Sequence, residues 1–273
     1  MYNIDDVTFV SGYWMVERPI KYEFNHYHKL IPKTFSLLEN KNVAFFYEDR
    51  GFLDYLNKHI KTKKFLSYYL HSIDLPAHEI TKDYVNTCKE QDVASLKKIY
   101  PYKEGGLLWY EQVEKGLEKW PMMKDHEPSY FTQTCIMFSK SFLVKEIIKK
   151  NPFNTNYFAW VDLSISRFKH NRKNADFTKF DFTNKYMYHY SSFVRYYGKR
   201  QKVNGSFMFG HKSKWEEFLP LYESELIKLK NSKYCHSDES VITSVVNKSP
   251  DLFKAIDDGE RPRIGLLPKT KAD

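Results

Sequence analysis

The sequence predicts an α/β protein with a mostly parallel central sheet that helices cover on both faces. Short runs of β-branched and aromatic residues, such as 7–12 and 43–47, alternate in the first half of the chain with segments of helical apolar spacing. The strand-like runs are apolar almost throughout, as is typical of strands buried on both sides. No linker is evident, so we expect one domain over residues 1–256. The tail, 257–273, is rich in Pro, Gly and charge, which predicts partial mobility.

The elements follow in order from periodicity and from the residues that start or stop them. The strand at 7–12 ends in small residues that let another backbone approach closely. Residues 20–38 have mostly helical spacing, with Pro32 as a break or the start of a second helix, and the strand at 43–47 completes a βαβ unit. Further helices are expected at 51–60, 84–100, 107–120, 130–150, 214–229 and 236–246. Further strands are expected at 65–70, in the run before Asp162, and at 180–183, 186–190 and 205–210.

Length and cysteine content indicate a soluble protein of a reducing compartment. A chain of 273 residues buries enough apolar surface to fold without disulfides. Its three cysteines, Cys88, Cys135 and Cys235, are widely separated, odd in number and in no metal-ligand spacing. The longest apolar stretches are far below the roughly 20 residues that span a bilayer. We therefore expect a cytoplasmic protein with at most peripheral membrane contact.

The charge balance favours anionic partners. The sequence has 43 Lys and Arg against 34 Asp and Glu, which gives a formal net charge of +9. Acidic residues lie between most lysine clusters, as on solvated helix faces, and no recognition motif is present, so we expect no specific nucleic-acid partner. The 21 Tyr and 21 Phe residues would suit stacking on bases or sugar rings, although a well-packed aromatic core explains them equally simply.

One carboxylate stands out by its position in the sequence. Asp162 ends an aromatic and β-branched run within residues 151–168, and ligands of open α/β sheets bind at the carboxyl ends of strands. Asp162 is therefore either presented to a pocket or caps the following turn. Trp160 is expected in the core. The sequence lacks the P-loop, the dinucleotide-binding glycine motif, the nucleophile elbow and the zinc-protease helix, which excludes the commonest hydrolase and dehydrogenase classes.

A series of short motifs between residues 130 and 253 occurs in a characteristic order. They are Ser-Lys at 139–140, Asn-Pro-Phe at 151–153, Trp-x-Asp at 160–162, Asn-Gly-Ser-Phe-Met-Phe-Gly at 204–210, Ser-Asp-Glu at 237–239 and Pro-Asp-Leu-Phe at 250–253. This order resembles the HtrL/YibB group of bacterial and viral proteins, which is similar to nucleotide-sugar-dependent glycosyltransferases of the GT-A fold. The resemblance implies a single GT-A-like, Rossmann-like domain. It also implies transfer of a sugar from a nucleoside-diphosphate donor, such as a UDP-sugar, to a saccharide or glycan hydroxyl, for surface polysaccharide or glycoprotein glycan synthesis.

The resemblance also implies a divalent metal ion, Mn²⁺ or Mg²⁺, at Asp162. GT-A enzymes commonly hold such an ion on an Asp-x-Asp at a strand end, but here Asp162-Leu163-Ser164 supplies a single carboxylate. One carboxylate, water and phosphate oxygens can still hold the ion. His211 is the candidate for a further protein ligand and His236 is the alternative, although a lone histidine near a turn is more often a surface residue.

Most of the remaining site residues are also carried by the resemblance, whereas Arg18 and Arg167 are chosen for their positions after the first strand and five residues past Asp162. Asp238 or Glu239 would act as the general base on the acceptor hydroxyl; alternatively, Asp238 caps the last helix and Glu239 interacts with its dipole. The residues expected to bind the donor are Val10, Ser11, Gly12 and Tyr13 for the base, and Arg18, Lys140 and Arg167 for the diphosphate. Each of these cations has an alternative role as an ordinary surface charge.

A non-catalytic protein is the rival hypothesis. The incomplete Asp-x-Asp and the positive net charge would also suit a degenerate transferase that binds an anionic glycan or nucleic acid without turning it over.

Overall fold

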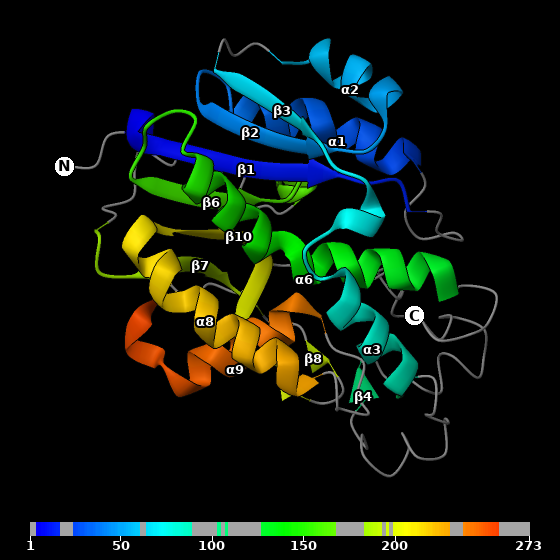
Figure 1. The fold of residues 1–273 in the computed structure, drawn as a ribbon, viewed down its shortest axis with the longest axis vertical. Helices are drawn as coiled ribbons and strands as arrows, with labels where there is room; N and C mark the ends of the chain where they lie inside the picture. The colour runs from blue at the N-terminus through cyan, green and yellow to red at the C-terminus, as the bar shows by residue number, and fades with distance from the viewer. Residues whose placement is uncertain are drawn as a thin grey trace, which may run out of the picture.

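The computed structural model describes residues 4–16, 24–60, 64–88, 103–104, 107–108, 127–167, 183–192, 195–196, 199–229 and 237–256. Its centre is a seven-stranded sheet in the order β11-β7-β10-β6-β1-β2-β3 (Figure 1). The strands of this sheet are β1 (Val7–Tyr13), β2 (Asn42–Tyr47), β3 (Phe65–Tyr69), β6 (Tyr157–Val161), β7 (Met187–Ser191), β10 (Val203–His211) and β11 (Phe253–Ala255). Two further strand pairs are β4 (Lys103–Glu104) with β5 (Leu107–Leu108), and β8 (Arg195–Tyr196) with β9 (Lys199–Arg200).

Helices connect most of these strands. The α-helices are α1 (Phe24–Leu37), α2 (Arg50–Asn57), α3 (His78–Cys88), α6 (Glu127–Lys150), α8 (Lys212–Leu229) and α9 (Asp238–Lys248). Single 3-10 turns lie at η1 (Ile4–Asp6), η2 (Ser72–Asp74), η4 (Ile165–Arg167) and η6 (Pro250–Leu252). Within the part of the chain that the structure describes, no helix combines the length and apolar character needed to cross a bilayer.

The predicted mostly parallel α/β sheet is confirmed. Strand β1 runs parallel to β2 and β6, β2 runs parallel to β3, and β11 runs parallel to β7. Strand β10 alone among the seven is antiparallel to both of its neighbours, β6 and β7. The carboxyl ends of β1, β2, β3 and β6 therefore meet at one edge of the sheet, where ligands of open α/β sheets bind.

Alternate residues of the central strands pack into two separate cores. In β1, Val10 points to the face covered by α3, α6, α8 and α9, whereas Val7 and Phe9 point to the face covered by α1 and α2. Strand β6 divides in the same way, with Phe158 and Trp160 on the first face. Figure 1 shows α6 and α8 lying across the near side of the sheet. Because a strand alternates its side chains with a period of two, a run that is apolar throughout fills both cores.

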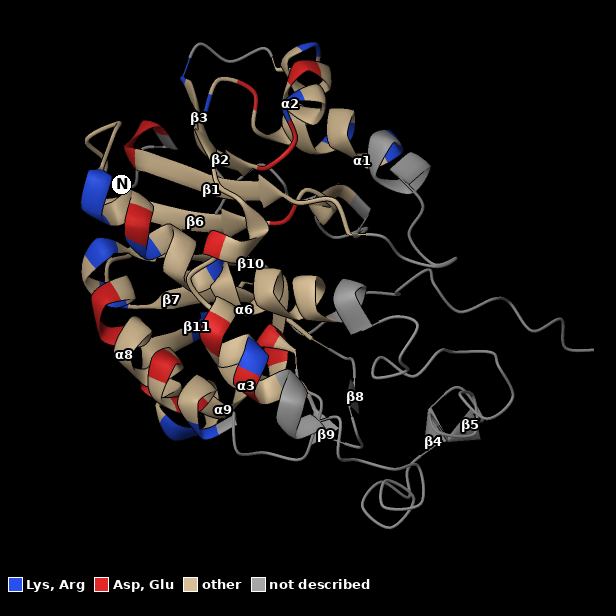
Figure 2. Cartoon of the chain, turned by 45° about the vertical axis from the view of Figure 1, so that its right-hand side comes forward, with Lys and Arg blue, Asp and Glu red and all other residues tan. Residues whose placement is uncertain are grey.

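Charged residues lie mainly on the helices. Figure 2 shows Lys and Arg interspersed with Asp and Glu along them, while the central strands are largely uncharged. Of the lysine clusters in the sequence, Lys149 and Lys150 lie exposed in the last turn of α6 as expected, whereas Lys199 lies on strand β9.

The expectation that Pro32 breaks the helix is wrong. Pro32 lies inside α1, which is continuous from Phe24 to Leu37. The flanking residues Ile31 and Phe35 are buried against the sheet, and the Thr34 hydroxyl donates to the Leu163 carbonyl at 2.6 Å. Tertiary packing on both sides of the proline outweighs the hydrogen bond that its ring removes.

Several other predicted elements differ from those of the structure. Residues 65–69 form a strand as expected, but β3 is the sheet edge and is largely exposed rather than buried. Residues 107–108 are strand β5, not the start of a helix, and 109–120 lie outside the described residues. Residues 89–100 of the helix predicted at 84–100, and residues 180–182 of the strand predicted at 180–183, also lie outside the described residues. The predicted tail, 257–273, also lies outside the described residues.

A charged cluster joins α8 to α9. The Glu225 side chain, 10% exposed, accepts hydrogen bonds from Lys228 at 2.8 Å, Lys248 at 2.5 Å and the Ser244 hydroxyl at 2.6 Å. Burial raises the pKa of Glu225, but the hydrogen bonds from Lys228, Lys248 and Ser244 outweigh burial and lower the pKa to about 2. The ionised carboxylate therefore stabilises the folded state.

We expect Glu225→Gln to lower the free energy of unfolding at neutral pH by about 1–3 kcal/mol, since it removes charge-assisted hydrogen bonds. Because the folded-state pKa lies below the ordinary value of 4.5, the contribution is complete above pH 4.5 and is lost as pH falls toward about 2. Denaturant unfolding of both proteins across this range measures the effect. The exposed Glu223→Gln on the same helix is the control. A stability difference between wild type and Glu225→Gln that does not shrink on acidification contradicts the prediction.

Candidate functional site

The order in which the chain adds strands to the sheet reverses between β1 and β6. From β1 the chain builds β2 and β3 toward one edge of the sheet, whereas β6 lies on the other side of β1 and is followed by β10 and β7. Such a reversal opens a crevice outside the carboxyl ends of the two strands, and ligands bind there in open α/β sheets. Val10 pairs with Trp160 in the register of β1 and β6, so Gly12 and Asp162 emerge beside each other at this point.

Asp162 lies at this reversal and keeps part of its carboxylate in solvent. Its side chain is 20% exposed. The Oδ1 atom accepts a hydrogen bond from the Trp160 indole at 2.7 Å, and its backbone N–H donates to the Ser206 carbonyl at 2.9 Å. Trp160 is buried, as expected for a core residue, and it also orients the acid. The carboxylate thus contacts side chains rather than capping the following turn, which leaves it available at the edge of the sheet.

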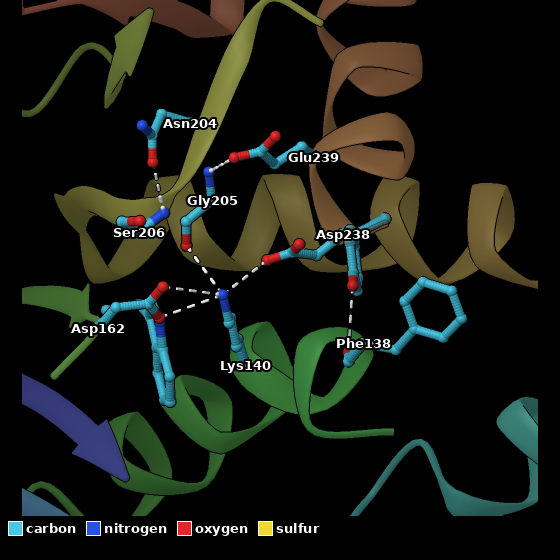
Figure 3. Close-up of polar contacts among 10 residues, drawn as sticks. Phe138, Lys140, Asp162, Asn204, Gly205, Ser206, Asp238 and Glu239 are labelled. Carbon is cyan, nitrogen blue, oxygen red and sulfur yellow. Dashed lines mark hydrogen bonds and ion pairs between the residues drawn. The ribbon is translucent and has the colours of Figure 1, made fainter. Parts of the chain in front are cut away.

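The Lys140 ammonium is the centre of the site (Figure 3). It lies 3.1 Å from Asp162 Oδ1, 3.3 Å from Asp162 Oδ2, 2.9 Å from Asp238 Oδ2 and 3.2 Å from the Gly205 carbonyl oxygen. An ammonium has three N–H donors, and the two carboxylates and the carbonyl are enough to use all three. Lys140 was expected to bind the diphosphate, but its donors are directed at protein groups and its side chain is only 12% exposed.

The charge state of Lys140 follows from these neighbours. Burial lowers the pKa of the Lys140 ammonium, but the adjacent Asp162 and Asp238 carboxylates outweigh burial, and the pKa is raised above its ordinary value. Lys140 is therefore positively charged at neutral pH. The ammonium also lies 5.9 Å from the centre of the Trp160 ring, within the range of a cation–π contact.

Asp238 is buried at the first position of α9. Its side chain is 5% exposed, and burial raises the pKa of its carboxyl while Lys140 opposes the shift. Ser237 occupies the N-cap position without a side-chain capping hydrogen bond, and Asp238 is the first helical residue, so Asp238 is not the cap that the alternative interpretation predicted. Its carboxylate faces inward onto Lys140 and does not reach a solvent-side acceptor in this arrangement.

Glu239, the next residue of α9, contacts the Gly205 backbone and not Lys140. It is partly exposed, and its Oε1 atom accepts a hydrogen bond from the Gly205 N–H at 3.0 Å. Asp238 and Glu239 thus hold the Gly205 segment from two directions, one through Lys140 and the other directly (Figure 3). Of the two candidate bases, Glu239 is the less buried residue, although its Oε2 atom is itself buried.

Gly205 is a site residue that the sequence analysis did not identify. Strand β10 shifts register against β7 between Asn204 and Met208, and the resulting bulge directs the Gly205 carbonyl to Lys140. A Cβ at position 205 would overlap Asp238 Oδ2 and lie 3.0 Å from its Cγ. Only glycine fits this close approach. The glycine within a strand-like run was the available signal, because such a glycine often marks a bulge.

A small cavity lies behind the ion pairs. Its volume is about 10 Å³, which is room for about one water molecule. Lys140 and Asp238 line it together with Trp160, Met208 and Trp215. A sugar does not fit this cavity, so a substrate would have to lie on the solvent side of Asp162.

The four residues expected to bind a nucleobase all lie on β1 with their backbones near this edge. Val10 is fully buried in the core, and Ser11 is 1% exposed with a hydroxyl that has no hydrogen-bond partner among the described residues. Gly12 packs under the Trp14 ring, where a Cβ would come within 2.6 Å of Cζ3. The Tyr13 ring stacks on Phe52, with ring centroids 3.8 Å apart, so one of its faces is already used.

His211 does not join Asp162. It is the last residue of β10, which runs antiparallel to β6 and pairs His211 with Tyr157 at the start of that strand. Five residues of strand therefore separate it from Asp162, roughly 16 Å. No single ion can bind both, and the prediction of His211 as a metal ligand beside Asp162 is wrong for this reason. His236 and Arg18 lie outside the described residues, and for Arg167 the structure describes the backbone of η4 only.

The described residues do not fit a resident divalent ion at Asp162. Among them, no group of three or more His, Cys, Asp or Glu side chains is placed to hold a metal. The Asp162 and Asp238 carboxylates are both turned onto the Lys140 ammonium. An ion would have to displace that ammonium before it could bind them.

Comparison with known proteins identifies the family. A sequence family described as "Bacterial protein of unknown function (HtrL_YibB)" matches residues 5–261, which is most of the chain. The chain belongs to the HtrL_YibB family. The matched region of this HtrL_YibB protein includes Lys140, Asp162, Gly205 and Asp238. No curated protein matches the sequence significantly.

Solved structures give weaker likenesses to this HtrL_YibB protein. One is mouse xyloside xylosyltransferase 1 in its apo form, with 13% identity and a TM-score of 0.43 over 92% of this chain and 84% of that chain. Another is a glycosyltransferase involved in the glycosylation of the major capsid of PBCV-1, with 13% identity and a TM-score of 0.39 over 92% and 81% of the two chains.

We expect Gly205→Ala to destabilise the HtrL_YibB protein by about 1–3 kcal/mol, because the added Cβ forces Asp238 away from Lys140. The free energy of unfolding by denaturant measures this. Gly51→Ala is the matched control, since its Cβ meets only a flexible Asp49 carboxylate oxygen at 3.2 Å in the exposed first turn of α2. The control should be neutral or gain up to about 1 kcal/mol from helix propensity. Equal effects of the two substitutions contradict the prediction.

Proposed function

We propose that this protein is a glycosyltransferase that moves a sugar from a nucleoside-diphosphate donor to a saccharide or glycan hydroxyl. The observation that carries the proposal is the position of Asp162. It is a partly exposed carboxylate at the carboxyl end of β6, beside β1, where the strand order reverses and α/β sheets bind nucleotides. The order of motifs that resembles the HtrL/YibB group, and through it the GT-A glycosyltransferases, supports the reaction class.

The donor is proposed to lie across the ends of β1 and β6. The Asp162 carboxylate accepts hydrogen bonds from hydroxyls of the ribose or the sugar, as an ionised carboxylate is an acceptor only. The backbone of Ser11, Gly12 and Tyr13 borders the same edge and is the proposed surface for the base. Lys140 is engaged by protein groups, so we assign the departing diphosphate to Arg18 and Arg167.

Glu239 is the proposed general base. It removes the proton of the acceptor hydroxyl, the acceptor oxygen bonds to the anomeric carbon, and the bond from that carbon to the diphosphate breaks. The diphosphate leaves with the bonding electron pair, and arginine side chains compensate its charge. Asp238 acts through Lys140 as a positioning residue, because it is buried away from any acceptor. We derive no step through a metal ion, since the described residues do not fit one.

We expect UDP or GDP to raise the melting temperature of the wild-type protein, because a ligand that binds only the folded state stabilises it by about 2.7 kcal/mol at 100 times its Kd. Asp162→Asn should weaken this binding by tenfold or more, which corresponds to a lost hydrogen bond to a charged group. A thermal-shift titration measures both. Asp251→Asn, at an exposed position in η6, is the control for loss of one negative charge. The absence of any nucleotide shift and of donor hydrolysis would favour the non-catalytic binding protein.

We expect Glu239→Gln to lower turnover by about 10²- to 10⁴-fold, the usual contribution of a general base. Asp238→Asn should lower the stability of the protein more than Glu239→Gln does, since it weakens the buried contact with Lys140. Transfer assays together with melting temperatures separate the two effects, and Glu223→Gln on the surface of α8 is the control. Unchanged turnover in Glu239→Gln would remove that residue from the mechanism.

A further inference from the structure

Asp162, the acid expected to hold a divalent ion, is instead joined to a second acid, Asp238, by a lysine. Asp162 and Asp238 come from different elements, β6 and α9, and both contact the Lys140 ammonium within 3.3 Å. We propose that Lys140 is a resident cation that takes the place of a divalent metal ion between Asp162 and Asp238. The consequence of this proposal for catalysis rests on the proposed function. Its consequence for ion binding does not.

The oxygen atoms around the ammonium are of the kind that a hard divalent cation prefers. They comprise the carboxylates of Asp162 and Asp238 and the carbonyl of Gly205. Mg²⁺ and similar ions take carboxylate, carbonyl and water oxygens, at about 2.0–2.1 Å for Mg²⁺. The ammonium takes the same oxygens at 2.9–3.3 Å. The lysine therefore occupies a ligand set that is otherwise suited to a metal.

The protein holds this ammonium firmly. Lys140 lies on α6, whose neighbouring residues Phe138 and Ser139 are fully buried, and the Ser139 hydroxyl accepts a hydrogen bond from the Ala77 N–H at 3.1 Å. The helix therefore cannot rotate Lys140 away from the acids without breaking its own packing. Both acids also raise the pKa of Lys140, so a metal cannot enter by deprotonating it. An entering ion would have to move a charged side chain that is 12% exposed out to solvent.

Two consequences separate this arrangement from a metal site. The wild-type protein should bind no divalent ion at Asp162, and any transfer activity should resist chelators. Removal of the lysine side chain should leave two carboxylates and a carbonyl around an empty space, which creates a site for Mn²⁺.

The test measures Mn²⁺ binding to the protein without nucleotide or donor, by loss of the free-Mn²⁺ signal in electron paramagnetic resonance. Wild type and Lys140→Ala are compared, with Lys145→Ala as the control because Lys145 is an exposed residue of the same helix. We expect Lys140→Ala to gain one Mn²⁺ site per chain, at least tenfold tighter than any binding to wild type or to the control. The double variant Lys140→Ala with Asp162→Asn should lose that site.

Two results would overturn the proposal. The first is a single Mn²⁺ on the wild-type protein that Asp162→Asn removes, since the ion and the ammonium cannot share the position. The second is a folded Lys140→Ala that gains no site. Should Lys140→Ala be unfolded as purified, its circular dichroism is followed as Mn²⁺ is added. Recovery of the native spectrum supports the proposal, and no recovery overturns it. Because no nucleotide is present, the result is independent of whether the protein transfers a sugar.

Discussion

The buried ammonium of Lys140 is the interaction on which the site depends. It joins a helix, the end of a central strand, a bulge and the start of α9 through contacts of 2.9–3.3 Å. Removal of one partner of a buried ion pair costs about 3–5 kcal/mol, since the other charge is left without compensation. Lys140 is therefore one link between α9 and the bulge of β10, beside the direct hydrogen bond from the Gly205 N–H to Glu239. Asp238 is tolerated at 5% exposure only because that cation faces it.

The position of Asp162 was predictable from the sequence because it depends on local pattern. A run that is apolar on both faces is a central strand, and the polar residue after it emerges at the edge of the sheet. The partner of Asp162 was not predictable in the same way. Lys140 is 22 residues from Asp162 and 65 from Gly205 in the chain. The Ser-Lys motif indicated a cation, but only the folded arrangement shows that it faces buried acids rather than a diphosphate.

The antiparallel direction of β10 explains why His211 does not lie beside Asp162 as predicted. Alternating strands and helices predicted a parallel sheet, and four strand pairs obey it, but β10 enters from the other direction. A residue at the end of β10 thus lies at the edge opposite to a residue at the end of β6. The residues of β10 are buried almost throughout, and such a pattern contains no information on strand direction. The same antiparallel entry gives Gly205, near the start of β10, its place beside Asp162.

Two adjacent acids at the start of α9 acquire different roles from helix geometry alone. Successive residues of an α-helix are turned by about 100°, so Asp238 points to the Lys140 ammonium while Glu239 accepts a hydrogen bond from the Gly205 N–H. With all three carboxyls ionised, Asp162, Asp238 and Glu239 exceed the one ammonium by two formal negative charges. A diphosphate that approaches this group is repelled unless further cations lie beside it. For the proposed diphosphate donor, this charge balance favours phosphate contacts with residues outside the Lys140 cluster, and it is the physical reason for proposing Arg18 and Arg167.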